Sequence, residues 1–154
     1  MAIAGCTGHD PSGATKATAL VIDTCRDSAG QQGKDPAPAR LVDGVDGFIG
    51  DTNASDTLPV QNVGGQRYLV WKAALAVAPT ARPYRTVSVI SPASARLVYP
   101  RGVTSRVRLP ACGRRYTLYT GGIVVRHPAC VTLGVVGPAG RPATVTVPVL
   151  VARC

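Results

Sequence analysis

The chain has 154 residues, a single-domain length that can bury a core, and 16% of these residues are charged and 5% aromatic. There is no Glu, every acid is an Asp between Asp10 and Asp56, and the net charge is −4 up to residue 56 and +13 from residue 57 onward. No apolar run reaches the roughly 20 residues of a membrane-spanning helix, and no carboxylate pair for acid–base catalysis exists beyond Asp56.

Residues 1–17 are rich in Gly, Ser, Thr and Pro, a composition typical of a flexible tail, and we expect one domain over residues 18–154. Within the tail, Ile3-Ala4-Gly5-Cys6 resembles the lipobox of bacterial lipoproteins, in which small residues precede the lipid-bearing cysteine. The resemblance implies lipidation of Cys6 and an extracellular or cell-envelope location. Five residues precede Cys6, without the charged and apolar regions of an export signal, so this hypothesis requires a gene start further upstream.

The first half of the domain alternates short apolar segments with loops. In chain order, the patterns predict a strand at 18–24, a loop at 26–40, a short irregular hairpin at 41–49 and a second loop at 50–66. The segment 67–78 fits either a helical stripe or a strand. We favour a strand, because Gly-Gly and Pro flank the segment and its surroundings are strand-like. Alternation then places five apolar side chains on one face: Leu69, Trp71, Ala73, Leu75 and Val77.

Strand patterns continue to the end of the chain. They predict strands at 84–90, 95–99, 106–109, 115–120, 123–126, 130–136 and 144–151. In the last of these, Pro148 has no N–H donor, which places the strand at a sheet edge or at a bulge. About nine strands separated by Gly and Pro turns predict an all-β fold, namely an antiparallel β-sandwich of Ig-like or Greek-key type, with a small β-barrel as the alternative.

The chain has five cysteines, and none of them belongs to a Cys-x-x-Cys pair. Because His9 and His127 are not spaced to complete a zinc site, we expect no metal and no cofactor. With Cys6 set aside for a lipid, the remaining cysteines can form disulfides, which persist in oxidising compartments: Cys25, Cys112, Cys130 and Cys154.

The segment Thr120-Gly121-Gly122 predicts the loop of a β-hairpin between strands at 116–119 and 123–125. A loop centred on Gly121 pairs residues whose numbers sum to 242, which places Cys112 opposite Cys130. We therefore expect a Cys112–Cys130 disulfide, and by elimination a second one between Cys25 and Cys154.

A catalytic alternative rests on His127 and Cys130. The stretch Arg126-His127-Pro128-Ala129-Cys130 resembles the His-Gly-Cys signature of L,D-transpeptidases, which cross-link cell wall, and implies a thiolate nucleophile with an imidazole beside it. The spacing is one residue longer than in that signature, and the glycine is absent. We therefore expect no catalytic residue in this segment.

Arginines gather in sequence around the expected hairpin, interleaved with Tyr116 and Tyr119. They are either the solvated rim of half-buried tyrosines or an anion-binding surface, since Arg beside an exposed aromatic ring binds phosphates and stacks on bases or sugars. The candidate anion-binding residues are Arg106, Arg108, Arg114, Arg115 and Arg126.

Together these features predict a non-enzymatic secreted or lipid-anchored module with a binding or structural role at a bacterial cell envelope. We expect its basic face to meet an anionic envelope polymer, a lipid headgroup or a protein, ahead of nucleic acid. One alternative is a virion or assembly subunit with a basic all-β fold, and another is a Cys/His envelope enzyme that uses Cys130.

Overall fold

The computed structural model of the chain describes residues 20–33, 39–49, 60–138, 140 and 142–154. The predicted tail and the lipobox-like segment with Cys6 lie outside these residues. Within the described residues the secondary structure is almost entirely β, and two short 3-10 turns interrupt it, η1 (Cys25–Asp27) and η2 (Pro79–Ala81).

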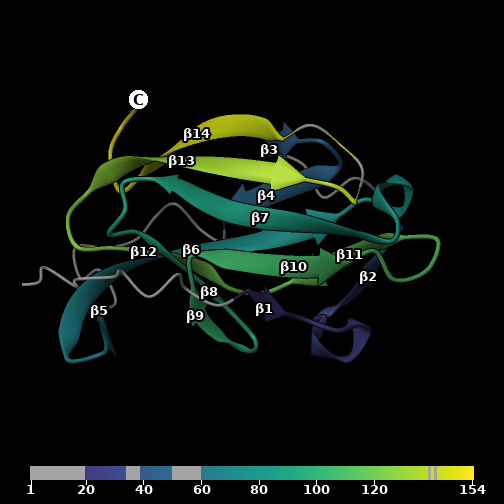
Figure 1. Ribbon diagram of the computed structural model, residues 1–154, viewed down its shortest axis with the longest axis horizontal. Helices are drawn as coiled ribbons and strands as arrows, with labels where there is room; N and C mark the ends of the chain where they lie inside the picture. The colour runs from purple at the N-terminus through teal and green to yellow at the C-terminus, as the bar shows by residue number, and fades with distance from the viewer. Residues whose placement is uncertain (1–19, 34–38, 50–59, 139, 141) are drawn as a thin grey trace, which may run out of the picture.

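The strands form two sheets packed face to face, which confirms the predicted β-sandwich, and the described strands do not close into a barrel. The five-stranded sheet has the order β1 (Val21–Ile22), β10 (Arg106–Pro110), β7 (Tyr84–Ser91), β13 (Ala129–Val136) and β14 (Ala143–Val149) (Figure 1). The main path of the nine-stranded sheet is β2 (Gly30–Gln32), β11 (Tyr116–Tyr119), β6 (Gln66–Val77), β12 (Gly122–Val125), β8 (Arg96–Tyr99) and β9 (Gly102–Thr104). Three further strands complete that sheet, β3 (Ala39–Val42), β4 (Val45–Ile49) and β5 (Val60–Val63).

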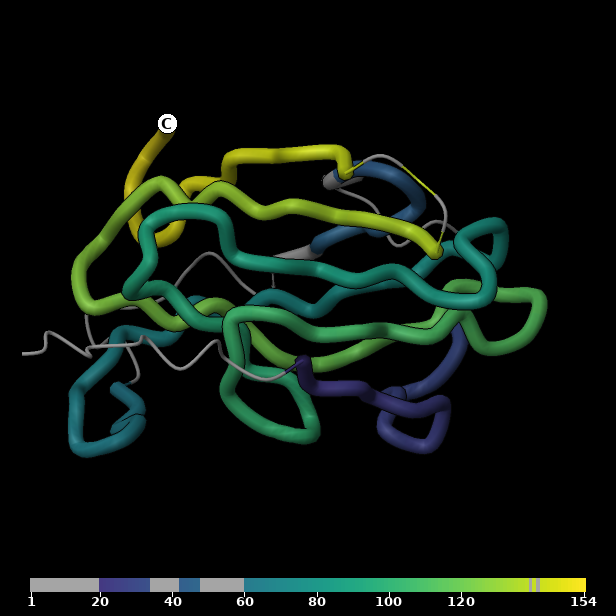
Figure 2. Tube along the Cα trace, viewed as in Figure 1, coloured from purple at the N-terminus to yellow at the C-terminus, as the bar shows by residue number. Residues whose placement is uncertain are grey.

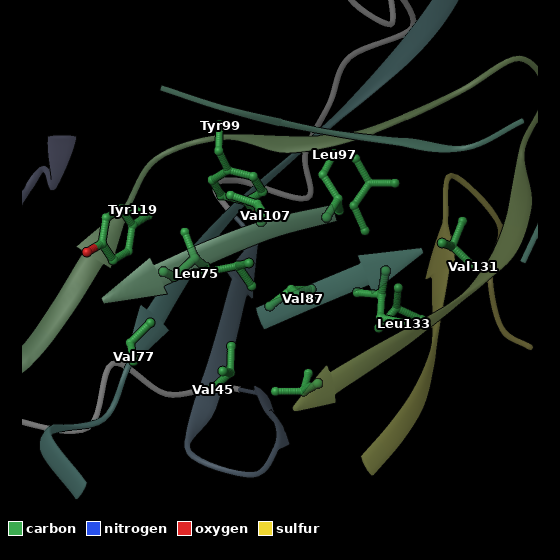
Figure 3. Close-up of a cluster of buried hydrophobic side chains, with 14 of the residues drawn as sticks. Val45, Leu75, Val77, Val87, Leu97, Tyr99, Val107, Tyr119, Val131 and Leu133 are labelled. Carbon is green, nitrogen blue, oxygen red and sulfur yellow. The ribbon is translucent and has the colours of Figure 1, made fainter. Parts of the chain in front are cut away.

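Strand β6 is the centre of the larger sheet and the strand whose character the sequence left open between helix and strand. It runs for 12 residues, and its alternating apolar residues from Leu69 to Val77 face the other sheet, as predicted. Opposite them, Val131, Leu133 and Val135 of β13 are at most 1% exposed. Figure 3 labels Leu75 and Val77 of β6 and Val131 and Leu133 of β13 in the core, where each fully buried aliphatic side chain contributes about 1.5–3 kcal/mol.

Two hairpins have two-residue turns with positive φ at both positions, the geometry that matches strand twist. Asp43 and Gly44 (φ 48° and 74°) join β3 to β4, which confirms the hairpin predicted at 41–49. Gly64 and Gly65 (φ 56° and 77°) join β5 to β6. The sequence placed β5 in a loop, because its four residues, Val-Gln-Asn-Val, are too few and do not alternate apolar with polar side chains.

The hairpin predicted at Thr120-Gly121-Gly122 is wrong. Strands β11 and β12 both pair with the same side of β6, with Tyr119 opposite Leu75 and Gly122 opposite Lys72. One register therefore continues through the two glycines, and neither of them has a positive φ. The segment 116–125 runs along β6 as a single extended stretch instead of folding back on itself.

The structure also corrects the disulfide pairing, because Cys25 bonds to Cys112 and Cys130 bonds to Cys154. The Cα atoms within the two pairs lie 5.7 and 5.6 Å apart. Parallel pairing of β1 with β10 carries Cys25 beside the end of β10, where Cys112 follows. Antiparallel pairing of β13 with β14 returns the C-terminal segment to the start of β13 and to Cys130, as the trace in Figure 2 shows.

Candidate functional site

A basic cleft lies at the end of the larger sheet where β6 begins, between β5 on one side and β12 on the other. Its volume is about 480 Å³. Two arginines and a histidine contribute to its wall, and no carboxylate does so among the described residues. The lining residues are Val60, Gln66, Arg67, Tyr68, Leu69, Arg126 and His127.

Arg126 is held in this basic cleft by contacts with β6. The register that pairs Val125 with Leu69 places Arg126 opposite Tyr68, and its guanidinium carbon lies 5.9 Å from the centroid of the Tyr68 ring. Its Nη2 group also donates a hydrogen bond to the side-chain oxygen of Gln66. Because a guanidinium has five N–H donors, most of them stay available to an anion after this bond forms.

The ion pairs of the described residues lie away from the basic cleft. Arg85 pairs with Asp43 at 3.0 Å, and Arg101 pairs with Asp27 at 2.6 Å. Arg67 and Arg126 are both exposed, and none of the described residues in the cleft wall is an acid that could neutralise them. Positive charge in a concave, partly apolar site attracts anions more strongly than the same charge on a flat surface.

The five candidate anion-binding arginines are close in sequence but do not form one cluster in the structure. Because 116–125 is extended, Arg115 and Arg126 lie about 36 Å apart along the strand. Arg114 and Arg115 are exposed in the loop before β11, whereas Arg106 and Arg108 belong to β10 of the other sheet. Of the five, the basic cleft contains Arg126.

Arg108 lies over a tyrosine ring, outside the basic cleft. Its guanidinium carbon lies 4.3 Å from the centroid of the Tyr84 ring, and its Nε atom is buried without a hydrogen-bond partner. A partly buried guanidinium over an aromatic ring stabilises the sheet face and offers fewer donors to a ligand than Arg126 does.

Sequence reasoning did not identify four lining residues of the basic cleft: Val60, Gln66, Arg67 and Tyr68. Gln66, Arg67 and Tyr68 precede Arg126 by about 60 positions, and only the pairing of β6 with β12 brings them together. Gly64-Gly65 was a usable local signal for the β5–β6 turn. No local signal identifies which distant strand pairs with β6.

The His127 and Cys130 pair does not form a nucleophile and its base in this structure. Cys130 is bonded to Cys154, so its sulfur is not available as a thiolate. His127 is exposed and lines the basic cleft together with Arg126. No group of three or more metal-ligating side chains occurs within the described part of the chain.

A second hollow, the interlayer cavity, lies inside the sandwich and has a volume of about 250 Å³. Side chains from both sheets form its wall, with Trp71, Leu75, Leu97 and Ile123 on one side and Leu133 and Val147 on the other. If a cavity of this size stayed closed and empty, it would cost on the order of 6 kcal/mol. That cost is comparable with the whole stability of a small domain, so filling the cavity would have a large effect on the free energy of unfolding.

Asp23 is a fully buried carboxylate between β1 and η1. Burial raises the pKa of its carboxyl, and the nearby charge of Asp27 raises it further, while the main-chain N–H and the guanidinium of Arg101 lower it. Neither carboxylate oxygen makes a hydrogen bond of ordinary geometry. By contrast, hydrogen bonds from Arg101 and Thr24 lower the pKa of Asp27 to about 2. Because Asp23 has no exposed surface, it offers nothing to a ligand, and its effect is on stability.

The two aspartates are expected to change stability in opposite directions with pH. The pKa of Asp23 is higher in the folded state, so its stabilising contribution is complete below 3.8 and is lost as pH rises through the folded pKa. Asp23→Asn should therefore raise the free energy of unfolding at pH 7, by about 1 kcal/mol. The contribution of Asp27 is present above 3.8 and is lost as pH falls through about 2, so Asp27→Asn should destabilise at pH 7 and much less at pH 2.

Urea unfolding of both variants and the parent between pH 2 and pH 7 checks these opposite slopes. A lower stability of Asp23→Asn at pH 7 would contradict a charged, poorly solvated carboxylate at this position. Equal slopes for Asp27→Asn and the parent would contradict the role of the Arg101 ion pair.

No protein-family model matches the chain, and neither the curated proteins nor the solved structures contain a match.

Proposed function

We propose that this chain is a non-enzymatic binding module, secreted or lipid-anchored at a bacterial cell envelope, and that it binds an anionic polymer of the envelope in the basic cleft. The observation that carries the proposal is the Arg126 guanidinium, positioned over Tyr68 beside Arg67 and His127, with no carboxylate in the described wall. Two exposed arginines suit a polymer that carries negative groups, and Tyr68, which is 5% exposed, positions the Arg126 guanidinium.

The compartment is inferred from the cysteines and from the N-terminal segment. Two disulfides are compatible with an oxidising location outside the cytosol. The lipobox-like Ile3-Ala4-Gly5-Cys6 supports a lipid anchor, although it lies outside the described residues. Within the described residues no helix is long and apolar enough to cross a membrane.

Removing both arginines of the basic cleft is expected to weaken binding to a polyanion. The variant Arg67→Ala/Arg126→Ala should lose at least about tenfold in affinity for heparin, because each charge-assisted hydrogen bond to an anion contributes about 1.5–3 kcal/mol. Elution from immobilised heparin along a salt gradient measures the loss, and parallel pelleting with anionic vesicles compares a polymer with a lipid surface.

The matched control is Arg106→Ala/Arg114→Ala, which removes the same charge from exposed positions outside the basic cleft. It should elute close to the parent chain. Equal losses in the two double variants would show that net charge, rather than the cleft, drives retention. Arg126→Lys keeps the charge and loses the planar fork, so it should fall between the parent and the double variant. No retention of the parent at low salt would refute the proposed function.

A further inference from the structure

We infer that the interlayer cavity is a second binding site, separate from the basic cleft, and that it takes a small hydrocarbon group of about the size of one alkyl-substituted aromatic ring. The cavity lies between the two sheets, and Figure 3 shows four of its wall residues, Leu75, Leu97, Tyr99 and Leu133, around the centre of the core.

The space arises from small residues at inward-facing positions of the larger sheet. Gly47 of β4 has no side chain, and Ala73 of β6 stands between the larger Trp71 and Leu75 on the same face. Stacked sheets lie about 10 Å apart, a gap that large side chains normally fill from both layers. Where glycine and alanine face the gap, Leu133 and Val147 of the opposite sheet leave part of it open.

The wall is apolar, and its one hydroxyl group is already bonded. The Tyr99 hydroxyl donates a hydrogen bond of 2.9 Å to the carbonyl oxygen of Ala73. Strand pairing engages the backbone of β6 around Ala73, and the Ala73 N–H donates to the Gly121 carbonyl at 3.0 Å. A bound water needs two to four polar partners, which this wall does not supply, so a hydrocarbon is the favoured occupant.

The size of the cavity sets the size of the ligand. An engineered apolar cavity of about 150 Å³ is known to bind benzene. The interlayer cavity, with about 250 Å³, has room for a ring and a short alkyl substituent. Trp71 and Tyr99 in its wall favour contact with an aromatic or unsaturated group.

We expect a ligand to enter at the edge of the sandwich. Pro148 lines the cavity from β14, the last strand of its sheet, and is itself exposed. Proline contributes no N–H to the strand pairing at this position, so this part of the wall is held less tightly than the centre of the sheet. The Cys130–Cys154 disulfide ties down the segment that follows β14.

Trp71 provides a direct probe, because it is the single tryptophan of the chain and lines the cavity. We expect butylbenzene to produce a saturable change in its fluorescence, with a dissociation constant on the order of 0.1–1 mM. The thermal midpoint should rise with ligand concentration. Octanoate is the second probe. Binding of butylbenzene alone supports a site for a free hydrocarbon, and binding of both supports a site that also admits a lipid chain.

Ala73→Leu should block the site and weaken binding of either probe at least tenfold. Ala74→Leu is the matched control, because it makes the same change at the next position of β6, on the opposite face, and should bind as the parent does. If Ala73→Leu fails to fold, Val147→Phe fills the cavity from the other sheet.

The inference is overturned if neither probe gives a saturable response with the parent chain, or if folded Ala73→Leu or Val147→Phe binds as well as the parent. Heparin retention of the Ala73→Leu variant tests the basic cleft independently of the cavity. It should equal that of the parent, because the basic cleft lies at the start of β6 and shares no lining residue with the cavity.

Discussion

Replacing Cys25 and Cys112 by alanine is expected to lower the free energy of unfolding by about 4.6 kcal/mol. The bond joins residues 87 positions apart, and the entropy that a cross-link removes from the unfolded chain grows with the length of the closed loop. The Cys130–Cys154 bond spans 24 positions, so its removal should cost less, about 3.5 kcal/mol. Urea unfolding of the two double variants without reductant measures both values.

The free energy lost with the Cys25–Cys112 bond is large compared with a typical domain stability of about 5–15 kcal/mol. The Cys25→Ala/Cys112→Ala variant is therefore expected to be marginally folded at best. A tryptic map without reduction identifies the bonds themselves, because cleavage sites lie between all four bonded cysteines, at Arg26, Arg114, Arg126 and Arg153. A peptide linking Cys112 to Cys130 would contradict the pairing described here, and so would a larger effect for the shorter loop.

Gly121→Asn is expected to destabilise the domain by at least about 3 kcal/mol. A Cβ atom at this position would lie within 3.0 Å of the Val98 carbonyl oxygen, and 2.6 and 2.7 Å from two carbons of the Tyr99 ring. Neither neighbour can move freely, because Val98 pairs with Gly122 in the sheet and the Tyr99 hydroxyl is bonded to Ala73. The free energy of unfolding in urea is the measurement.

Gly64→Asn is the matched control for this substitution. Gly64 occupies a hairpin turn with φ 56°, and a Cβ there would meet nothing within 4 Å. Asn is the side chain that tolerates this backbone region best, so the change should stay within about 0.5 kcal/mol. If residues 120–122 formed a surface hairpin, asparagine would be tolerated at both sites. Similar small effects would therefore refute the continuous strand.

The predictions that the structure confirms rest on patterns within one strand. The alternation from Leu69 to Val77 predicted the inward face of β6, and Pro148 predicted a strand at a sheet edge. Both signals are local, because side chains alternate between the two faces of any strand and proline lacks a donor wherever it stands. Neither depends on which strand lies alongside.

The wrong predictions concern which distant segments of the chain lie next to each other in the fold. The chain contains Gly-Gly at 64–65 and at 121–122, and the first pair forms a turn while the second continues a strand. Glycine adopts both conformations at little cost, so the dipeptide alone does not distinguish them. At Gly121 the deciding contact is the Tyr99 ring, which arrives from β8 and occupies the place of the missing side chain. The predicted disulfides failed for the same reason, because they were inferred from the assumed turn.

The sequence by itself determined the all-β class, the strand whose apolar face builds the core, the edge position of the last strand and the separation of acids from bases along the chain. Only the tertiary structure decided the disulfide partners, the meeting of Arg126 with Tyr68, and the cavity next to Ala73. Each of these depends on pairing between distant segments, and the free energy of that pairing comes from the whole packed sandwich rather than from the residues that meet.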